Sequence, residues 1–134
     1  VLEPTKIYVK PILNAAKKVE IKGAVHITGD AYLKFDRLMK FSKGIGLEFN
    51  NFKPQSIFEL IQKTAPEVRG VIKDEEMLKT FNMGWGFAVV ADKTNEDSTI
   101  ESFEKSGVKA ERIGKVTDSG KIVALYRDKK LELS

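Results

Sequence analysis

The sequence predicts an α+β sandwich, in which a mixed β-sheet packs against helices. Three observations lead to this fold class. Segments with apolar residues at helical spacing alternate with short strand-like segments bounded by glycine, proline and aspartate. The almost wholly apolar stretch 85–91 is typical of a strand buried on both faces, at the centre of a helix-covered sheet. The 134 residues, 42% hydrophobic and 31% charged, suffice for one globular domain, residues 1–134, with a sizeable core.

The first half of the chain is predicted to hold two helices and two strands. Leu2 to Pro11 carries prolines at both ends, and we expect an extended segment, like a connection from a preceding domain. Residues 12–19 have the apolar spacing of a helix. The segment 23–28 is predicted as a strand that places Ala24, His26 and Thr28 on one face and Val25 and Ile27 on the other. A helix over 31–41 and a strand over 44–50 follow.

The second half is predicted to hold three helices, the apolar strand 85–91 and a hairpin. Pro54 opens a helix over 54–64, in which an inward stripe is formed by Ile57, Phe58, Leu60 and Ile61. Asp74 is predicted to cap a short helix over 75–80. A capping box at Ser98-x-x-Glu101 starts a helix that Gly107 ends. The segments 111–117 and 121–127, separated by Asp118-Ser119-Gly120, are predicted to pair as a β-hairpin.

Composition excludes several functional classes. With no cysteine, the chain has neither a disulfide framework nor a thiolate metal site, and the single histidine excludes a multi-histidine metal centre. No apolar stretch approaches the ~20 residues that span a bilayer, and the first residues lack the apolar core of a signal peptide. We therefore expect a cytoplasmic protein with no membrane role. The chain begins without methionine, so we also expect it to be part of a longer polypeptide.

Positive charge is concentrated in the first third of the chain. Residues 1–43 carry nine Lys/Arg against four Asp/Glu, whereas residues 44–134 carry fourteen against fifteen. A local positive field raises the concentration of anions such as phosphates near the surface. A solvated lysine-rich surface explains the same imbalance, so it gives only modest support to a phosphate ligand.

The first candidate site lies at the end of the strand 23–28. His26 can donate or accept a hydrogen bond near neutral pH, although most lone histidines on strands are structural. Thr28, Gly29 and Asp30 then supply a hydroxyl, an open backbone and a carboxylate. Strand ends are where α/β folds commonly bind ligands. We therefore interpret His26 to Asp30 as a candidate ligand-binding segment.

The second candidate site is the run from Thr80 to Gly86, which reads Thr-Phe-Asn-Met-Gly-Trp-Gly. It places an amide side chain, Asn82, and two glycines, Gly84 and Gly86, between a short acidic helix and an apolar strand. Neither the Walker A loop nor the dinucleotide fingerprint is present. A tight turn, close strand packing and an asparagine that caps its own turn account for the same residues. Close approach of a ligand to the backbone is the alternative.

Together these segments resemble the C-terminal domain of the aminoimidazole ribonucleotide synthetase (phosphoribosylformylglycinamidine cyclo-ligase) family. The motifs stand in the order found in that family: Leu2-Glu3-Pro4-Thr5-Lys6-Ile7-Tyr8-Val9, His26-Ile27-Thr28-Gly29, Pro54-x-x-Ile57-Phe58, Glu76-Met77-x-x-Thr80-Phe81-Asn82-Met83-Gly84-x-Gly86 and Ile113-Gly114-x-Val116. The resemblance covers nearly the whole chain, and the run from Glu76 to Gly84 is its most discriminating part.

The resemblance implies an ATP-dependent ligase of purine biosynthesis that closes the imidazole ring of aminoimidazole ribonucleotide. It implies ATP and Mg2+ bound mainly by an N-terminal domain of the same chain, a small-molecule ribonucleotide substrate and a homodimer. It assigns catalytic roles to His26 and Asn82 and substrate or phosphate contacts to Thr28, Gly29, Asp30, Thr80, Gly84 and Gly86, with no metal site in this chain. The isolated chain is expected to be inactive.

The chain departs from the family after Gly29, where further glycines are usual and Asp30 and Ala31 stand instead. Asp30 is expected to offer its carboxylate to a metal ion or a ribose hydroxyl. Related ATP-using enzymes, such as formylglycinamidine ribonucleotide synthetase and selenophosphate synthetase, share the architecture and remain alternatives. A basic nucleic-acid-binding module is another, although the basic residues are not interleaved with aromatics. A non-catalytic subunit-interface domain is a third.

Overall fold

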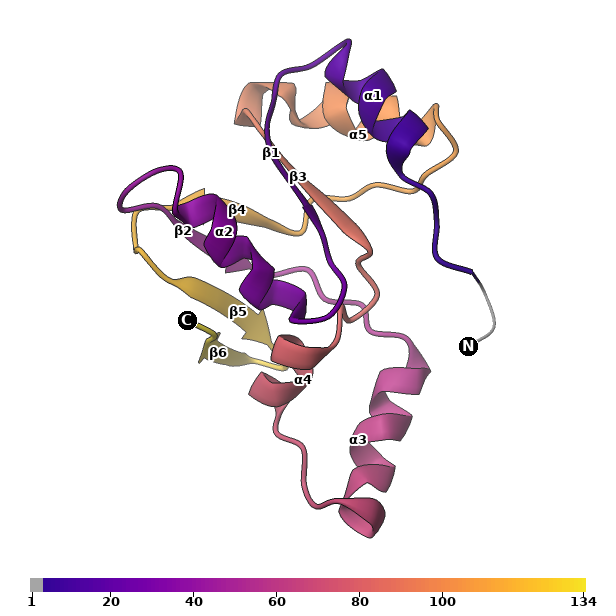
Figure 1. Ribbon diagram of the computed structural model, residues 1–134, viewed down its shortest axis with the longest axis vertical. Helices are drawn as coiled ribbons and strands as arrows, with labels where there is room; N and C mark the ends of the chain where they lie inside the picture. Colours follow the sequence, from indigo (N-terminus) through magenta and orange to yellow (C-terminus); the bar gives the residue numbers. More distant parts are fainter. Residues whose placement is uncertain (1–3) are drawn as a thin grey trace. The chain divides into compact units, whose positions relative to one another are not determined.

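The computed structural model describes residues 4–134, so the expectations for Leu2 and Glu3 lie outside the described residues. The chain forms two compact units. The first unit comprises Ile27–Trp85 and Ile113–Ser134. The second comprises Gly86–Arg112 and, of the described residues, 4–26. Figure 1 labels the helices and strands of both units. Helices and mixed sheets together make the α+β class that the sequence predicts, with the strands divided between two sheets.

The first unit is built on a four-stranded mixed sheet. Its strands are β2 (Gly46–Phe49), β4 (Gly114–Thr117), β5 (Ile122–Tyr126) and β6 (Lys129–Glu132), in the order β4-β2-β5-β6 (Figure 1). β2 runs antiparallel to β4 and parallel to β5. Leu47, opposite Val116 and Ile122, is buried, as is Phe49, so the strand expected over 44–50 contributes these two side chains to the core.

The predicted hairpin of 111–117 with 121–127 is wrong, because β2 lies between β4 and β5. The turn forms as expected, with Gly120 at φ +66°. β2 takes the place between β4 and β5, and its Leu47 and Phe49 are buried, with Phe49 packed against Tyr32 and Phe35. β5 instead forms a hairpin with β6, a strand that the sequence analysis missed, through Arg127 and Asp128, both at positive φ.

Four helical segments accompany this sheet: η1 (Ala31–Phe35), α2 (Asp36–Met39), α3 (Ser56–Val68) and α4 (Asp74–Thr80). The helix predicted over 31–41 is present as a 3-10 turn that continues into α2. In α3, Pro54 precedes the helix and Leu60 is 55% exposed, so the predicted inward stripe is wrong at Leu60. The predicted cap at Asp74 is also wrong, since Lys73 is the N-cap residue of α4.

An aromatic cluster forms the core of the first unit. The Tyr32 ring lies 5.0 Å from Phe49 and 5.4 Å from Phe52, edge to face in both cases. Phe35 lies 4.8 Å from Phe49, and Phe52 lies 5.5 Å from Tyr126. These distances lie in the range that aromatic pairs prefer, and each such pair stabilises the fold by about 0.5–1.5 kcal/mol beyond the effect of its buried area. The cluster fixes η1 against the sheet and therefore fixes where the segment before η1 ends.

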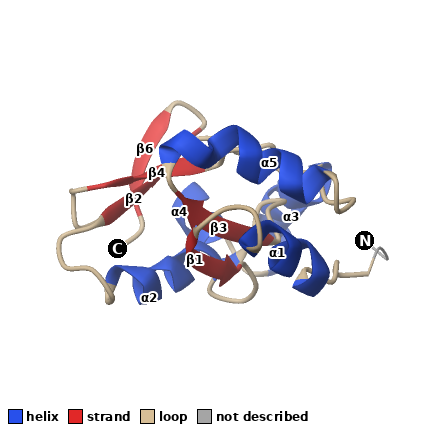
Figure 2. Ribbon diagram, turned by 90° about the horizontal axis from the view of Figure 1, so that it is seen from above, coloured by secondary structure: helices blue, strands red, loops and turns tan. Residues whose placement is uncertain are grey.

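The second unit pairs two strands and two helices. β1 (Ile21–His26) and β3 (Phe87–Ala91) form an antiparallel ribbon in which His26 is opposite Phe87. α1 (Val9–Ala16) packs beside α5 (Glu96–Glu104), which follows the short η2 (Lys93–Asn95), as seen in Figure 2. In β1, Val25 is buried while Ala24 and His26 are exposed, which confirms the predicted alternation.

Three further expectations for the second unit are wrong. The strand at 85–91 starts at Phe87, pairs only with β1 within the described residues and buries only Ala88, so it is not a central strand. The apolar run correctly predicted a strand, but it did not predict how many strands pair with it. Residues 9–11 belong to α1 and are not extended, because the missing N–H of Pro11 costs little in the first turn of a helix.

The predicted capping box of α5 is the third error. The helix begins at Glu96, two residues before Ser98, and Glu101 forms an ion pair with Lys105. An i,i+4 pair on the helix surface competes with the cap for the same carboxylate. The helix ends at Glu104, before Gly107 at φ +77°, as predicted. Among residues 4–134, no helix is both long enough and apolar enough to cross a membrane.

Candidate functional site

The segment that follows β1 belongs to the first unit and presents three consecutive exposed residues. Ile27 is buried, and after it Thr28, Gly29 and Asp30 are all exposed. The backbone bends here, since Asp30 has φ +64° and the N–H of Ala31 donates to the carbonyl of Thr28 at 2.9 Å. Aspartate tolerates this left-handed conformation better than most residues. A Cβ placed on Gly29 would meet no atom within 4 Å, so its backbone faces open space.

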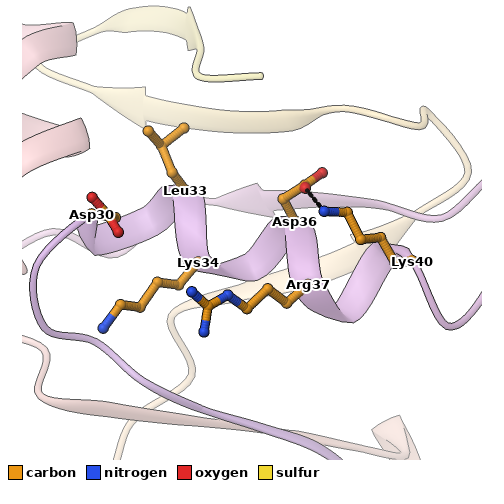
Figure 3. Close-up of a pocket in the computed structure, with 6 residues that line it drawn as sticks. All are labelled: Asp30, Leu33, Lys34, Asp36, Arg37 and Lys40. Atoms are coloured by element: carbon orange, nitrogen blue, oxygen red, sulfur yellow. Dashed lines mark ion pairs between the residues drawn. The ribbon is translucent and has the colours of Figure 1, made fainter.

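A shallow pocket of about 180 Å³ lies beside this bend. Its lining residues are Asp30, Leu33, Lys34, Asp36, Arg37 and Lys40. In Figure 3 the side chains of Lys34 and Arg37 extend to the same side of the helical segment, while Asp36 points the other way and pairs with Lys40 at 3.1 Å. The ammonium group of Lys34 donates to the hydroxyl of Thr28. The pocket is therefore continuous with the predicted Thr28–Asp30 segment.

The Asn82 turn of the first unit is held by its own hydrogen bonds. α4 ends at Thr80, which is exposed, and the Asn82 side-chain oxygen accepts from the N–H of Gly84 at 3.1 Å. The Asn82 carbonyl accepts from the N–H of Trp85 at 3.1 Å. Gly84 has φ +100°, a conformation that favours glycine. The asparagine thus caps its turn, which was one of the two interpretations open from the sequence.

Tyr32 connects this turn to η1. Its buried hydroxyl donates to the Asn82 carbonyl at 2.9 Å, and burial raises the pKa of Tyr32 well above its ordinary value. Trp85, at the end of the turn, is held by a separate hydrogen bond: its indole N–H donates to the Asn51 carbonyl at 2.8 Å. The first unit therefore joins the Asn82 turn to the helical segment that carries Lys34 and Arg37.

His26 and Gly86 belong to the second unit. The His26 ring is 5.8 Å from Tyr8, edge to face, and 5.8 Å from Phe87, while Tyr8 and Phe87 are 5.2 Å apart. A Cβ on Gly86 would overlap the Tyr8 hydroxyl, so the group that closely approaches this glycine is Tyr8. Partial burial raises the pKa of Tyr8. His26 is thus held in a three-ring cluster on an exposed face.

Sequence reasoning missed four residues around the predicted positions. Lys34 and Arg37 border the Thr28 bend. Both follow the bend in sequence and are three residues apart, which would place them on the same side of a helix, and this spacing was the available signal. Tyr8 and Phe87 contact His26 across the ribbon, and no local pattern indicates that pairing. Among residues 4–134, no three or more histidine, aspartate or glutamate side chains converge to hold a metal ion. Asp30 is therefore not part of such a group among these residues.

An α+β chain with an open Thr-Gly strand end and a cationic pocket beside it has the features of a domain that binds an anionic ligand. Comparison with known proteins identifies the family. Residues 1–127 match the family described as "AIR synthase related protein, C-terminal domain", and the chain belongs to it. This agrees with the family that the sequence motifs resemble.

Curated relatives support the same assignment. The chain is 38% identical to a phosphoribosylformylglycinamidine cyclo-ligase of Methanocaldococcus jannaschii, over 98% of the chain and 39% of the relative. It is 44% identical to one of Methanococcus maripaludis, over 88% of the chain and 32% of the relative. A Bacillus licheniformis relative of the same name is 37% identical, over 91% of the chain and 34% of the relative. The chain thus spans about a third of the length of these relatives.

Proposed function

We propose that this chain is the C-terminal domain of an ATP-dependent cyclo-ligase that converts formylglycinamidine ribonucleotide to aminoimidazole ribonucleotide in purine biosynthesis. The observation that carries the proposal is the match of residues 1–127 to the family. The relatives named phosphoribosylformylglycinamidine cyclo-ligase, 37–44% identical to this chain, support it. The chain is proposed to work with a preceding domain of the same polypeptide, in a homodimer in the cytoplasm.

The proposed reaction has two steps. ATP transfers its terminal phosphoryl group to the formyl amide oxygen, which releases ADP and leaves a phosphoryl imidate. An amidine nitrogen then attacks that carbon, the C–O bond breaks, phosphate leaves and the nitrogen loses a proton. Positioned donors and charge stabilisation accelerate such transfers. The described residues do not fit a Mg2+ site, so we assign ATP and Mg2+ chiefly to the preceding domain and derive no step through the metal.

The predicted site residues other than Gly86, which Tyr8 approaches, are assigned as follows in this proposal. His26 orients or protonates a reacting oxygen, because its imidazole is exposed and donates or accepts near neutral pH. Asn82 and Thr28 donate hydrogen bonds to substrate or phosphate; the Asn82 carboxamide oxygen is already used by Gly84, which leaves its NH2 group for a ligand. Gly29 and Gly84 allow close backbone approach, while Asp30, next to Gly29, and Thr80, at the end of α4, contact the substrate or its phosphate.

The test uses the full-length polypeptide that contains this segment. ATP-dependent formation of aminoimidazole ribonucleotide should be present in the wild type and fall at least about 100-fold in His26→Ala and Asn82→Ala, the loss typical of a positioned acid–base group. Leu125→Ala, a change at an exposed residue of β5, serves as the control. The 134-residue chain alone should form no product. Near-normal turnover in both site variants would remove the proposed roles, and an inactive wild type would remove the proposed activity.

A further inference from the structure

Lys34 and Arg37 form a pair of like charges with no compensating acid of their own. They are three residues apart, and both side chains extend to the same side of the helical segment (Figure 3). Neighbouring like charges on a helix repel each other. Within residues 4–134, Arg37 makes no ion pair or hydrogen bond, and Lys34 donates only to the Thr28 hydroxyl. This is the arrangement that an anionic ligand would stabilise.

The acidic residues of the pocket do not offset this pair. Asp36 points to the opposite side of the segment and pairs with Lys40 at 3.1 Å, so these two charges cancel (Figure 3). Asp30 lies at the start of the segment (Figure 3), and within residues 4–134 its carboxylate forms no ion pair with Lys34 or Arg37. The local excess of positive charge therefore lies on the side that also holds the Thr28 hydroxyl.

The donor set and the size of the pocket indicate a phosphate group. A guanidinium binds two phosphate oxygens through its planar fork, and an ammonium group adds a point charge. Thr28 adds a hydroxyl, and the Gly29 backbone beside it is unobstructed. At about 180 Å³, the pocket is smaller than the 300–1,000 Å³ typical of sites that enclose a whole small molecule. It fits the charged end of a ligand.

We propose that Lys34, Arg37 and Thr28 bind a phosphate monoester dianion. The inference rests on the proposed function, in which this group is either the 5′-phosphate of the ribonucleotide or the phosphoryl group that ATP delivers. Nucleotide base and ribose lie outside the pocket and are held elsewhere.

Steady-state kinetics of the full-length enzyme distinguish the two sources. Lys34→Gln and Arg37→Gln should each raise one KM about tenfold, equivalent to about 1.4 kcal/mol. A rise in KM for the ribonucleotide assigns the site to the 5′-phosphate, and a rise in KM for ATP assigns it to the phosphoryl group. Arg37→Lys should recover part of the loss, since it restores charge without the fork. Lys43→Gln, which removes the same charge from an exposed loop position nearby, should change neither KM.

A binding measurement separates this inference from the proposed function. Inorganic phosphate should bind the wild-type protein, with an affinity that falls at least tenfold in Arg37→Gln and is unchanged in Lys43→Gln. If the wild type lacks cyclo-ligase activity but the phosphate result holds, the phosphate site stands and the proposed function is wrong. If the enzyme is active while phosphate affinity and both KM values are unchanged in the Lys34 and Arg37 variants, the phosphate site is wrong and the function stands.

Discussion

The hydroxyl end of the Tyr8 ring fills the space that a side chain at Gly86 would need. The ring carbon that carries this hydroxyl would also lie only 3.1 Å from a Cβ at that position. The absence of a side chain at Gly86 therefore allows Tyr8 to lie against the β3 end of the ribbon. In this position the Tyr8 ring makes its edge-to-face contact with the His26 ring, 5.8 Å away.

Gly86→Ala should destabilise the protein by about 1–3 kcal/mol, because the methyl group forces Tyr8 to move or β3 to shift. Urea denaturation measures this change. The chain has a single histidine, so the ring-proton signals of His26 in the 134-residue chain are unambiguous, and they should shift when Tyr8 is displaced. Gly29→Ala is the matched control for stability, since a Cβ there meets no atom within 4 Å.

A second variant tests whether overlap with Tyr8 causes the destabilisation expected for Gly86→Ala. Tyr8→Phe removes the atom that overlaps most with the new methyl group, so it should cost less in the Gly86→Ala background than in the wild type. We expect a coupling free energy of about 1 kcal/mol between the two positions. Strictly additive costs would show that Tyr8 does not limit the residue at position 86.

Local patterns in the sequence predicted the local features of this site. Period-two alternation placed Val25 and His26 on opposite faces of the strand, and in the structure Val25 is buried while His26 is exposed. The Thr28-Gly29-Asp30 bend follows β1, which ends at His26, two residues before the predicted end of this strand, and the Asn82 turn follows α4. Each of these features depends on a few consecutive residues, whose side-chain volume, φ preference and hydrogen-bonding groups can be judged without knowing the rest of the fold.

Features that depend on distant pairing were not predictable in the same way. The position of β2 between β4 and β5 comes from pairing with segments far along the chain, and the turn that links β4 to β5 gives no sign of it. Likewise, Asp74 has the position and chemistry of a helix cap, but Gln62 and Arg127, 12 and 53 residues away, use its carboxylate. A short stretch of sequence around Asp74 shows that it can cap the helix, but it does not include Gln62 and Arg127, which bind its carboxylate instead.

The Asp74 carboxylate leads to a pH-dependent stability. Burial raises the pKa of Asp74, but the hydrogen bond from Gln62 and the charges of Arg127 and Lys129 outweigh burial and hold its pKa below the ordinary value. Such a carboxylate stabilises the fold fully above its unfolded pKa, about 3.9, and the contribution is lost as the pH falls through the lower folded pKa. Only 12% of the side chain is exposed, which limits screening by solvent.

We therefore expect Asp74→Asn to lower the free energy of unfolding by about 1–2 kcal/mol near pH 7, the scale of a charge-assisted hydrogen bond. The difference from wild type should shrink as the pH falls below about 4, because Asp74 binds a proton first in the unfolded state, and it should be lost once the pH falls below the lowered pKa of Asp74 in the folded state. Urea denaturation at a series of pH values measures both effects. Glu67→Gln, at an exposed residue of α3, should give a curve parallel to wild type. A deficit that persists unchanged at low pH would contradict the ionic origin.

The hydrogen bond from Tyr32 to the Asn82 carbonyl, 2.9 Å long, gives the remaining prediction. Tyr32→Phe keeps the ring among Phe35, Phe49 and Phe52 and removes only the hydroxyl. The Asn82 carbonyl retains the Trp85 N–H, so the cost in unfolding free energy should be about 1 kcal/mol or less.

Turnover should respond more than stability, because the lost bond joins the Asn82 turn to η1. In the full-length enzyme we expect kcat to fall several-fold in Tyr32→Phe, with the KM values within about twofold of wild type. Asn82→Ala is the matched comparison: it removes the side chain but keeps the carbonyl that Tyr32 uses, so its effect reports on the amide alone. Unchanged turnover in Tyr32→Phe together with a large loss in Asn82→Ala would mean that the turn holds its position without Tyr32.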